Sequence, residues 1–111
     1  MGAAKITLLE NRTTDGTDGY VAWERNSGAA MVTAVGEVNV TGSFDGASVG
    51  FFYNINGEDV PVHDASGAVA VTDNTQAFRL GIPHSQEIKA VVSSAGGSTD
   101  LTCTITELRA I

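Results

Sequence analysis

Residues 37–62 read EVNVTGSFDGASVGFFYNINGEDVPV, and this stretch carries the clearest information about the fold. Two dipeptides in it, Asp45-Gly46 and Asn56-Gly57, are strongly favoured in two-residue β-hairpin turns. Such turns need positive φ, which Asp, Asn and Gly tolerate better than other residues. The residues between and beside the turns are rich in Val, Phe and Tyr. The stretch therefore predicts three short antiparallel strands joined by two tight turns.

The two predicted turns also agree on one buried face. Side chains alternate between the two faces of a strand, so the register of each turn determines which residues share a face. Both registers bring apolar side chains together on the same side. The predicted cross-strand pairs are Val40 with Phe51 and Val38 with Tyr53 across the first turn, and Phe51 with Val62 and Tyr53 with Val60 across the second.

A further hairpin is predicted near the end of the chain, around a Gly96-Gly97 turn. Closing this turn places apolar residues opposite one another at every second position, as cross-strand packing favours. The three predicted pairs are Val92 with Leu101, Ala90 with Cys103, and Ile88 with Ile105.

The rest of the chain also predicts strands, at residues 5–9, 20–25, 69–71 and 78–82, with a polar loop at 10–19. The apolar run 29–35 could be a buried strand or a helical turn, and the glycines that bound it favour a strand. About nine short strands with one apolar face each predict an all-β fold, an antiparallel β-sandwich of the jelly-roll or Ig-like type. Its two sheets would pack over a single core.

Length and composition bound the possible functions. The 111 residues form one predicted domain, and 42% hydrophobic against 17% charged residues is a globular composition. The net charge of −7 opposes binding to nucleic acid and to anionic membranes, so neither partner is expected. The first residues lack the apolar stretch of a signal peptide, and a single cysteine, Cys103, excludes an intrachain disulfide. Synthesis in a reducing cytoplasm is expected.

No residue pattern predicts catalysis, a cofactor or a metal site. His63 and Asp64 are neighbours and would point to opposite faces of a strand, and His84 follows a proline in a turn. Neither histidine has metal-ligand spacing. The segment 15–19, DGTDG, lacks the calcium-loop ligand pattern and is interpreted as a solvated loop. Cys103 is expected to be a small buried side chain. The sequence thus predicts a protein that is not an enzyme.

Five residues are candidates for a protein interface. By alternation, Phe52 faces away from the core, between Asn39 on one side and Pro61 on the other. Pro61 has no N–H and indicates an edge or bulged position, so an exposed Phe beside it indicates a protein contact. The alternative is that the loop at 10–19 folds over Phe52. Trp23 and Tyr20 are the remaining candidates, as ligand-binding aromatic rings or as core residues.

From residue 35 onward the chain resembles small β-sandwich virion proteins of tailed bacteriophages. The resemblance spans residues 35–108, and residues 1–34 lie outside it. The segment YNINGEDV at 53–60 departs from the pattern, because relatives often have a longer loop there, rich in Gly and Thr and containing a Trp. The stretches that carry the resemblance are GSFDGASV at 42–49, AVAVT at 68–72, AFRL at 77–80 and IKAVVSSAGGSTDLT at 88–102.

The resemblance implies a structural protein located on the virion. Its most concrete form is a capsid decoration (cement) protein that binds the major capsid protein or another virion protein, as a homo-oligomer for which a trimer is expected. The family implies no catalytic residues. The alternative is a tail or fibre component with a carbohydrate-binding β-sandwich, and a small enzyme ranks third.

Overall fold

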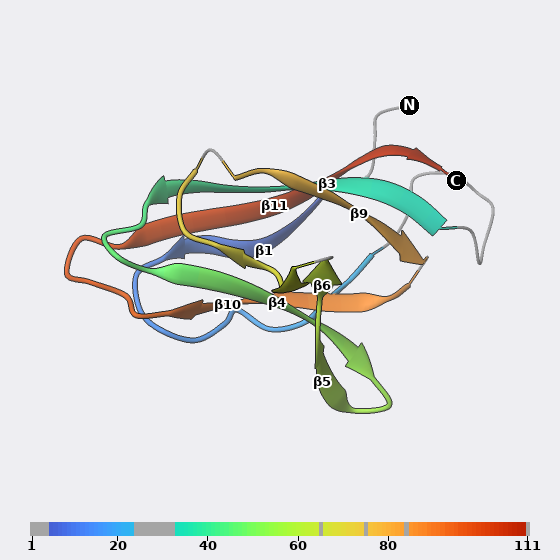
Figure 1. The fold of residues 1–111 in the computed structure, drawn as a ribbon, viewed down its shortest axis with the longest axis horizontal. Helices are drawn as coiled ribbons and strands as arrows, with labels where there is room; N and C mark the ends of the chain where they lie inside the picture. The colour runs from blue at the N-terminus through green and yellow to red at the C-terminus, as the bar shows by residue number, and fades with distance from the viewer. Residues whose placement is uncertain (1–4, 24–32, 65, 75, 84, 111) are drawn as a thin grey trace.

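The computed structural model describes residues 5–23, 33–64, 66–74, 76–83 and 85–110. These residues form β-strands and connecting loops, which confirms the all-β prediction (Figure 1). The described part of the chain contains no helix long and apolar enough to cross a membrane. The strands are β1 (Lys5–Arg12), β2 (Val21–Ala22), β3 (Thr33–Ser43), β4 (Ser48–Ile55), β5 (Glu58–Pro61), β6 (His63–Asp64), β7 (Gly67–Ala68), β8 (Ala70–Val71), β9 (Phe78–Pro83), β10 (Glu87–Ser93) and β11 (Asp100–Ala110).

Two antiparallel sheets form the layers of a β-sandwich. Sheet A has the strand order β1-β11-β3-β9, and sheet B has the order β2-β10-β4-β5. The short strand β8 pairs with the same edge of β4 as β5 does, at Val49 and Gly50. A separate two-stranded hairpin, β6-β7, lies between β5 and β8 along the chain. Figure 1 shows the two layers one above the other.

The connectivity is that of a jelly roll, one of the two sandwich types left open by the sequence. When the insertion β5–β7 is set aside, the remaining strands alternate between the sheets at every connection except the one from β4 to β8. The remaining eight strands can be numbered along the chain. Their spatial order is then first, eighth, third, sixth in sheet A and second, seventh, fourth, fifth in sheet B. This is the double Greek key that defines a jelly roll.

The core lies between the sheets and draws side chains from both. Phe51 of sheet B meets Phe78 of sheet A edge to face, with 5.2 Å between the ring centroids. Consecutive residues Leu8 and Leu9 are both buried, which a regular strand does not allow, and β1 accordingly has register irregularities at this point. The fully or nearly fully buried side chains include Leu8, Leu9, Trp23, Val38, Val49, Phe51, Ile82, Ile88, Ala90, Val92, Leu101, Cys103 and Ile105.

The first predicted turn forms, but it does not close a hairpin. Asp45 and Gly46 have φ of 45° and 85°, and the N–H of Ala47 donates to the carbonyl of Phe44 at 2.9 Å. However, β3 pairs with β11 and β9, whereas β4 pairs with β10, β5 and β8. The predicted pairs of Val40 with Phe51 and Val38 with Tyr53 are therefore wrong. The turn leads the chain from one sheet to the other.

The predicted hairpin around Gly96-Gly97 is wrong for the same reason. Strand β10 belongs to sheet B and β11 to sheet A, so their apolar residues face each other across the core and are not hydrogen-bonded neighbours. The predicted faces were nevertheless correct. Each of the six side chains is at most 1% exposed, namely Ile88, Ala90, Val92, Leu101, Cys103 and Ile105.

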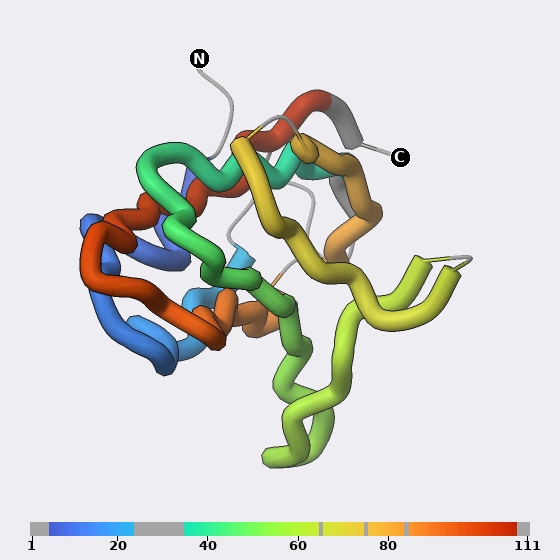
Figure 2. Tube along the Cα trace, turned by 60° about the vertical axis from the view of Figure 1, so that its left-hand side comes forward, coloured from blue at the N-terminus to red at the C-terminus, as the bar shows by residue number. Residues whose placement is uncertain are grey.

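The hairpin around Asn56-Gly57 is confirmed, with Tyr53 opposite Val60 and the Val62 N–H donating to the Phe51 carbonyl at 2.9 Å. Its outer part, residues 54–61, is called the wing here, because it projects beyond the sandwich (Figure 1, Figure 2). Within the described residues no second sheet covers the wing. Val60, which was expected on a buried face, is therefore 39% exposed.

The remaining strand predictions are confirmed in part. The first strand extends beyond the predicted residue 9 to Arg12, and β8 and β9 correspond to the strands predicted at 69–71 and 78–82. The strand predicted at 20–25 is reduced to Val21–Ala22 within the described residues, because residues 24–25 lie outside them. Residues 29–32 of the predicted strand 29–35 also lie outside the described residues, and β3 begins at Thr33.

Candidate interaction surfaces

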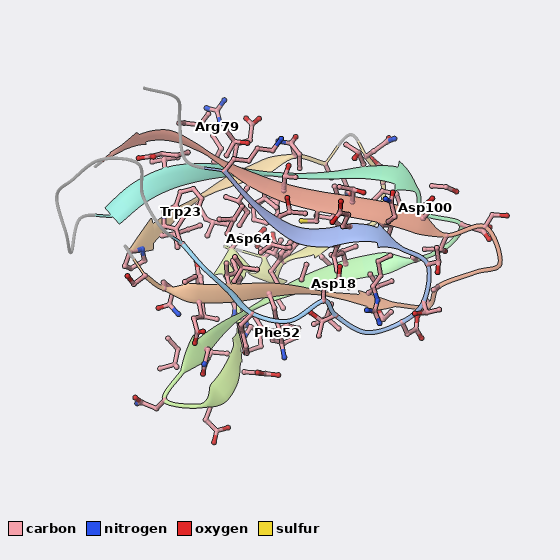
Figure 3. All side chains as sticks on the ribbon, turned by 180° about the vertical axis from the view of Figure 1, so that it is seen from behind. Asp18, Trp23, Phe52, Asp64, Arg79 and Asp100 are labelled. Atoms are coloured by element: carbon pink, nitrogen blue, oxygen red, sulfur yellow. The ribbon has the colours of Figure 1, made fainter. Side chains whose placement is uncertain are left out.

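One row of side chains crosses the outer face of sheet B. In the register of the sheet, Phe52 lies opposite Lys89 on β10 and opposite Pro61 on β5. Tyr20 extends the row next to Lys89, because the adjacent Val21 pairs with Ile88. The structure thus brings together three candidates from the sequence, Tyr20, Phe52 and Pro61. Figure 3 shows Phe52 on the outer side of the layer formed by β4 and β10.

A cluster of three polar side chains holds the base of the wing. The Tyr20 hydroxyl donates to the Asp59 carboxylate, and the Lys89 ammonium donates to the same carboxylate at 2.8 Å. Lys89 Nζ also lies 4.6 Å from the centroid of the Tyr20 ring, a cation–π contact. Burial, with the Asp59 carboxylate beside it, raises the pKa of Tyr20 to about 12. The hydrogen bonds from Lys89 and Tyr20 lower the pKa of Asp59.

Next to this row the outer face of sheet B is hollowed around Gly50. Gly50 lies in the interior of β4, with Val91 opposite on β10 and Ala70 opposite on β8. The missing side chain leaves a hollow of about 310 Å³, here called the Gly50 hollow, which is also lined by Phe52 and Pro61. A glycine in a strand interior often marks a place where another molecule approaches closely. This apolar hollow is therefore a candidate contact site.

A second hollow, here called the edge hollow, lies where β9 of sheet A and β8 of sheet B separate. Its volume is about 270 Å³. Apolar residues form its floor, with Val62 and Val71 buried and Phe78 and Leu80 packed against the core. Its other lining residues include His63, Asp64, Gln76 and Arg79.

His63 and Asp64 both line the edge hollow. They form the two-residue strand β6, as the prediction of opposite faces assumed, and both residues are exposed. The Ser66 N–H donates to the Asp64 carboxylate at 2.7 Å. Within the described residues no group of three or more His, Cys, Asp or Glu is placed to hold a metal ion. His84 lies outside the described residues.

The loop after β1 is ordered around a single guanidinium group. Arg12 donates to the carbonyls of Thr14 at 3.0 Å, Asp15 at 2.8 Å and Thr17 at 3.0 Å, and to the Asp18 carboxylate at 2.9 Å. An arginine cation thus occupies the centre of the loop, with three carbonyl oxygens and one carboxylate oxygen directed at it. The interpretation of residues 15–19 as a merely solvated loop is incomplete, and residues 13–19 are called the strap below.

The strap ties sheet A to sheet B along β10. Gly16 exchanges two backbone hydrogen bonds with Val92, at 2.9 and 2.7 Å, and the Ala95 N–H donates to the Asp15 carboxylate at 2.8 Å. On the other side, the Glu10 N–H donates to the Asp18 carboxylate at 2.9 Å. Because the strap follows the edge of β10 and Phe52 lines an open hollow on β4, the alternative in which this loop covers Phe52 is wrong.

Two interface candidates lie away from this surface. Trp23 is fully buried between the sheets and cannot reach a partner (Figure 3). Asn39 lies in sheet A opposite Thr104, not beside Phe52 as predicted, because β3 and β4 belong to different sheets. Its amide donates to Glu37 at 3.2 Å.

Three residues of the surface were not predicted: Gly50, Lys89 and Asp59. Gly50 could have been found, because it interrupts an apolar strand at an outward position. The Tyr20–Lys89–Asp59 cluster depends on strand pairing that sequence alternation does not determine. In the comparisons with known proteins, no family model, curated protein or solved structure matches the chain.

Proposed function

We propose that the protein is a non-enzymatic structural component of a tailed bacteriophage particle, a capsid decoration (cement) protein that acts as a homotrimer. The resemblance of residues 35–108 to small virion β-sandwich proteins supports this proposal. The jelly-roll topology is compatible with it, because this architecture recurs in viral capsid proteins. Lectin domains share the architecture, so the fold alone does not carry the proposal.

The observation that carries the proposal is the difference between the two outer sheet faces. The middle of the outer face of sheet A is polar, with the row Thr7, Thr104 and Asn39 across β1, β11 and β3, and the exposed Leu108 lies near the end of β11. The outer face of sheet B instead holds the half-buried Phe52 and the apolar Gly50 hollow. A solvated outer face of an antiparallel sandwich is usually polar. An apolar outer face indicates a protein contact.

Size and charge favour an assembly of several copies. The accessible surface of one chain is 5801 Å², and a stable contact takes roughly 800 Å² from each partner. Three linked copies would combine three such footprints on one shell, which raises the overall affinity without a larger contact per copy. The net charge of −7 would keep free subunits soluble before they meet the shell.

The alternative, a tail or fibre component that binds carbohydrate, has less support. Sugar rings usually stack on exposed aromatic side chains. Trp23 is buried, and the Tyr20 hydroxyl is bonded to Asp59, with Lys89 over the ring. Trp23 and Tyr20, the two aromatic residues considered as ligand-binding rings, are thus already engaged within the protein.

Substitution of Phe52 tests the proposed docking face. In Phe52→Asp a charge replaces the ring on the outer face, so we expect a folded protein whose binding to capsid shells lacking it falls at least tenfold. Thr41→Asp adds the same charge on the outer face of sheet A, where Thr41 is exposed, and should bind as the wild type does. Circular dichroism verifies the fold, and co-sedimentation with shells measures binding.

A second variant tests the contribution of the Gly50 hollow independently of the Phe52 ring. Among the described residues, a Cβ at Gly50 would have only Phe52 Cε1 nearby, at 3.7 Å, so Gly50→Ala should fold normally while it partly fills the hollow. Weakened binding is expected. Equal binding by all variants would remove this face from the contact. A strictly monomeric wild type, absent from purified particles by mass spectrometry, would refute the virion proposal itself.

A further inference from the structure

We propose that β9 is a docking edge for an extended segment of another protein, which adds to sheet A as a further strand and places an apolar side chain in the edge hollow. This surface lies at the edge of the sandwich and adjoins the outer face of sheet B, since the edge hollow and the Gly50 hollow share the lining residues Val69 and Ala70. The proposal does not depend on the virion function, and a protein with two contact surfaces could link two partners.

Among the described sheet edges, β9 is the longest regular one. It has six residues and pairs with β3 without a register shift. The edge strands β2 and β8 have two residues each, β5 contains Pro61, and β1 is interrupted by two irregularities. Short strands, proline and bulges are the usual devices that prevent an edge from pairing with another chain. β9 lacks such a device in its interior, so its backbone groups can pair with an added strand.

The edge hollow lies directly beside this edge. Phe78 and Leu80 of β9 form part of its floor, together with Val62 and Val71. Its volume of about 270 Å³ is below the roughly 300–1,000 Å³ of typical small-molecule pockets. The size suits one or two apolar side chains. In strand addition, backbone hydrogen bonds supply affinity and such pockets for alternate side chains supply specificity.

Charge identifies the kind of segment that fits. On the rim, Arg79 already pairs with Glu37 at 3.3 Å, while no described residue forms an ion pair with the exposed Asp64. The uncompensated charge at the rim is therefore negative, and the whole chain carries −7. A second copy of this chain would bring a second acidic rim toward the first. The occupant that fits is an extended segment with alternating apolar residues and a Lys or Arg near Asp64.

A synthetic peptide tests this proposal on the full-length protein. The probe is a short peptide in which valine alternates with threonine and a lysine stands at each end. We expect it to change the NMR amide shifts of β9 and of the edge-hollow residues, and to slow hydrogen exchange at β9. A peptide of the same sequence with alternate backbone nitrogens methylated cannot form the ladder and should bind at least tenfold more weakly.

A charge exchange tests the role of Asp64. Asp64→Lys should weaken binding of the lysine peptide about two- to fivefold, as expected for an exposed ion pair, and strengthen binding of the same peptide with glutamate ends. Asp100→Lys is the matched control, because it changes the net charge equally at an exposed position at the start of β11 (Figure 3). It should leave both affinities nearly unchanged.

Three results would overturn the proposal. They are equal binding of the methylated peptide, shift changes confined to surfaces other than β9 and the edge hollow, and dimerisation of the protein through β9 in place of peptide binding. The first would mean that the hollow binds side chains without an added strand. The last would mean that a second copy is the natural occupant.

Discussion

At the scale of single residues, Cys103 illustrates how completely the core excludes water. Its side chain is fully buried in β11, and burial raises the pKa of its thiol from 9.0 to about 12. Below pH 9.0 the thiol is protonated in both the folded and the unfolded chain, so it contributes no pH dependence. Between pH 9.0 and about 12 the unfolded chain releases this proton while the folded protein keeps it.

We therefore expect the free energy of unfolding to fall with rising pH above 9.0, with a contribution from Cys103 of up to about 1.4 kcal/mol per pH unit. Cys103→Ala should lower stability below pH 9.0, because it leaves a small cavity, and it should flatten the slope above pH 9.0, so that the two stability curves converge as the pH rises. Urea unfolding of both proteins between about pH 8 and about pH 10 measures the two slopes. Parallel curves would show that the thiol is not shielded. Tyr53, whose pKa burial raises to about 12, contributes equally in both proteins.

At the scale of elements, the turns show that local backbone conformation does not determine which strands pair. Gly46 and Gly57 have φ of 85° and 84°, where side chains other than Gly, Asn and Asp are strained. Gly97, expected from the sequence to resemble them, does not have a positive φ, and a Cβ there would meet no atom within 4 Å. The expectation for Gly97 is therefore wrong, since its turn spans Gly96 to Thr99 and does not close a hairpin.

The same substitution at these three turns should have unequal effects. Gly46→Val and Gly57→Val should each cost more than about 1 kcal/mol through backbone strain. Gly97→Val should change stability by less than about 0.5 kcal/mol, as substitutions at open surface positions usually do. Thermal melts of the three variants provide the comparison. A similar loss in all three, or none in the first two, would contradict these backbone conformations.

Alternation along the strands predicted which side chains are buried, but not which strands are neighbours. Val38, Val40 and Phe51 were correctly placed in the core, although β3 and β4 lie in different sheets. A two-residue turn reverses the chain equally well within a sheet or between sheets, and the choice depends on pairing with distant strands such as β11. The alternation of buried and exposed side chains has a period of two, and it does not indicate which strand lies beside which in a sheet.

The predictions for the candidate site were limited in the same way, because they succeeded only where local pairing determined a residue's position. The pair Phe52–Pro61 was predicted correctly, because it depends only on the local hairpin around Asn56-Gly57. Asn39 was misplaced, because its position depended on the hairpin that does not form. The burial of Trp23 depends on the packing of both sheets, which no local pattern reveals.

At the scale of the whole molecule, the two long sides of the sandwich differ. The strap closes the side of β1 and β10, while the side of β8 and β9 opens into the edge hollow. The four hydrogen bonds from Arg12 hold the strap, and the Arg12 side chain is only 22% exposed. Charged hydrogen bonds shielded from water contribute more to stability than exposed ion pairs.

Arg12→Ala should therefore lower the melting temperature by about 4 °C or more, which corresponds to at least ~1 kcal/mol. Arg12→Lys should recover only part of this loss, because a single ammonium group cannot reproduce the planar fork of donors. Arg79→Ala is the control, since its side chain is 63% exposed and its ion pair with Glu37 should contribute little. If Arg12→Ala melts like the wild type, the strap does not stabilise the sandwich.

The order of strands in the sheets also determines when the chain can fold. The last two described strands are central ones, because β10 joins β2 to β4 and β11 joins β1 to β3. During synthesis the N-terminal part emerges first, so the strands made earlier have no central partner until these residues follow. Until then they expose apolar faces and unpaired edges, the features that make nascent chains prone to aggregate. Completion of both sheets is thus a late event, and loss of the C-terminal strands would separate both sheets into pieces.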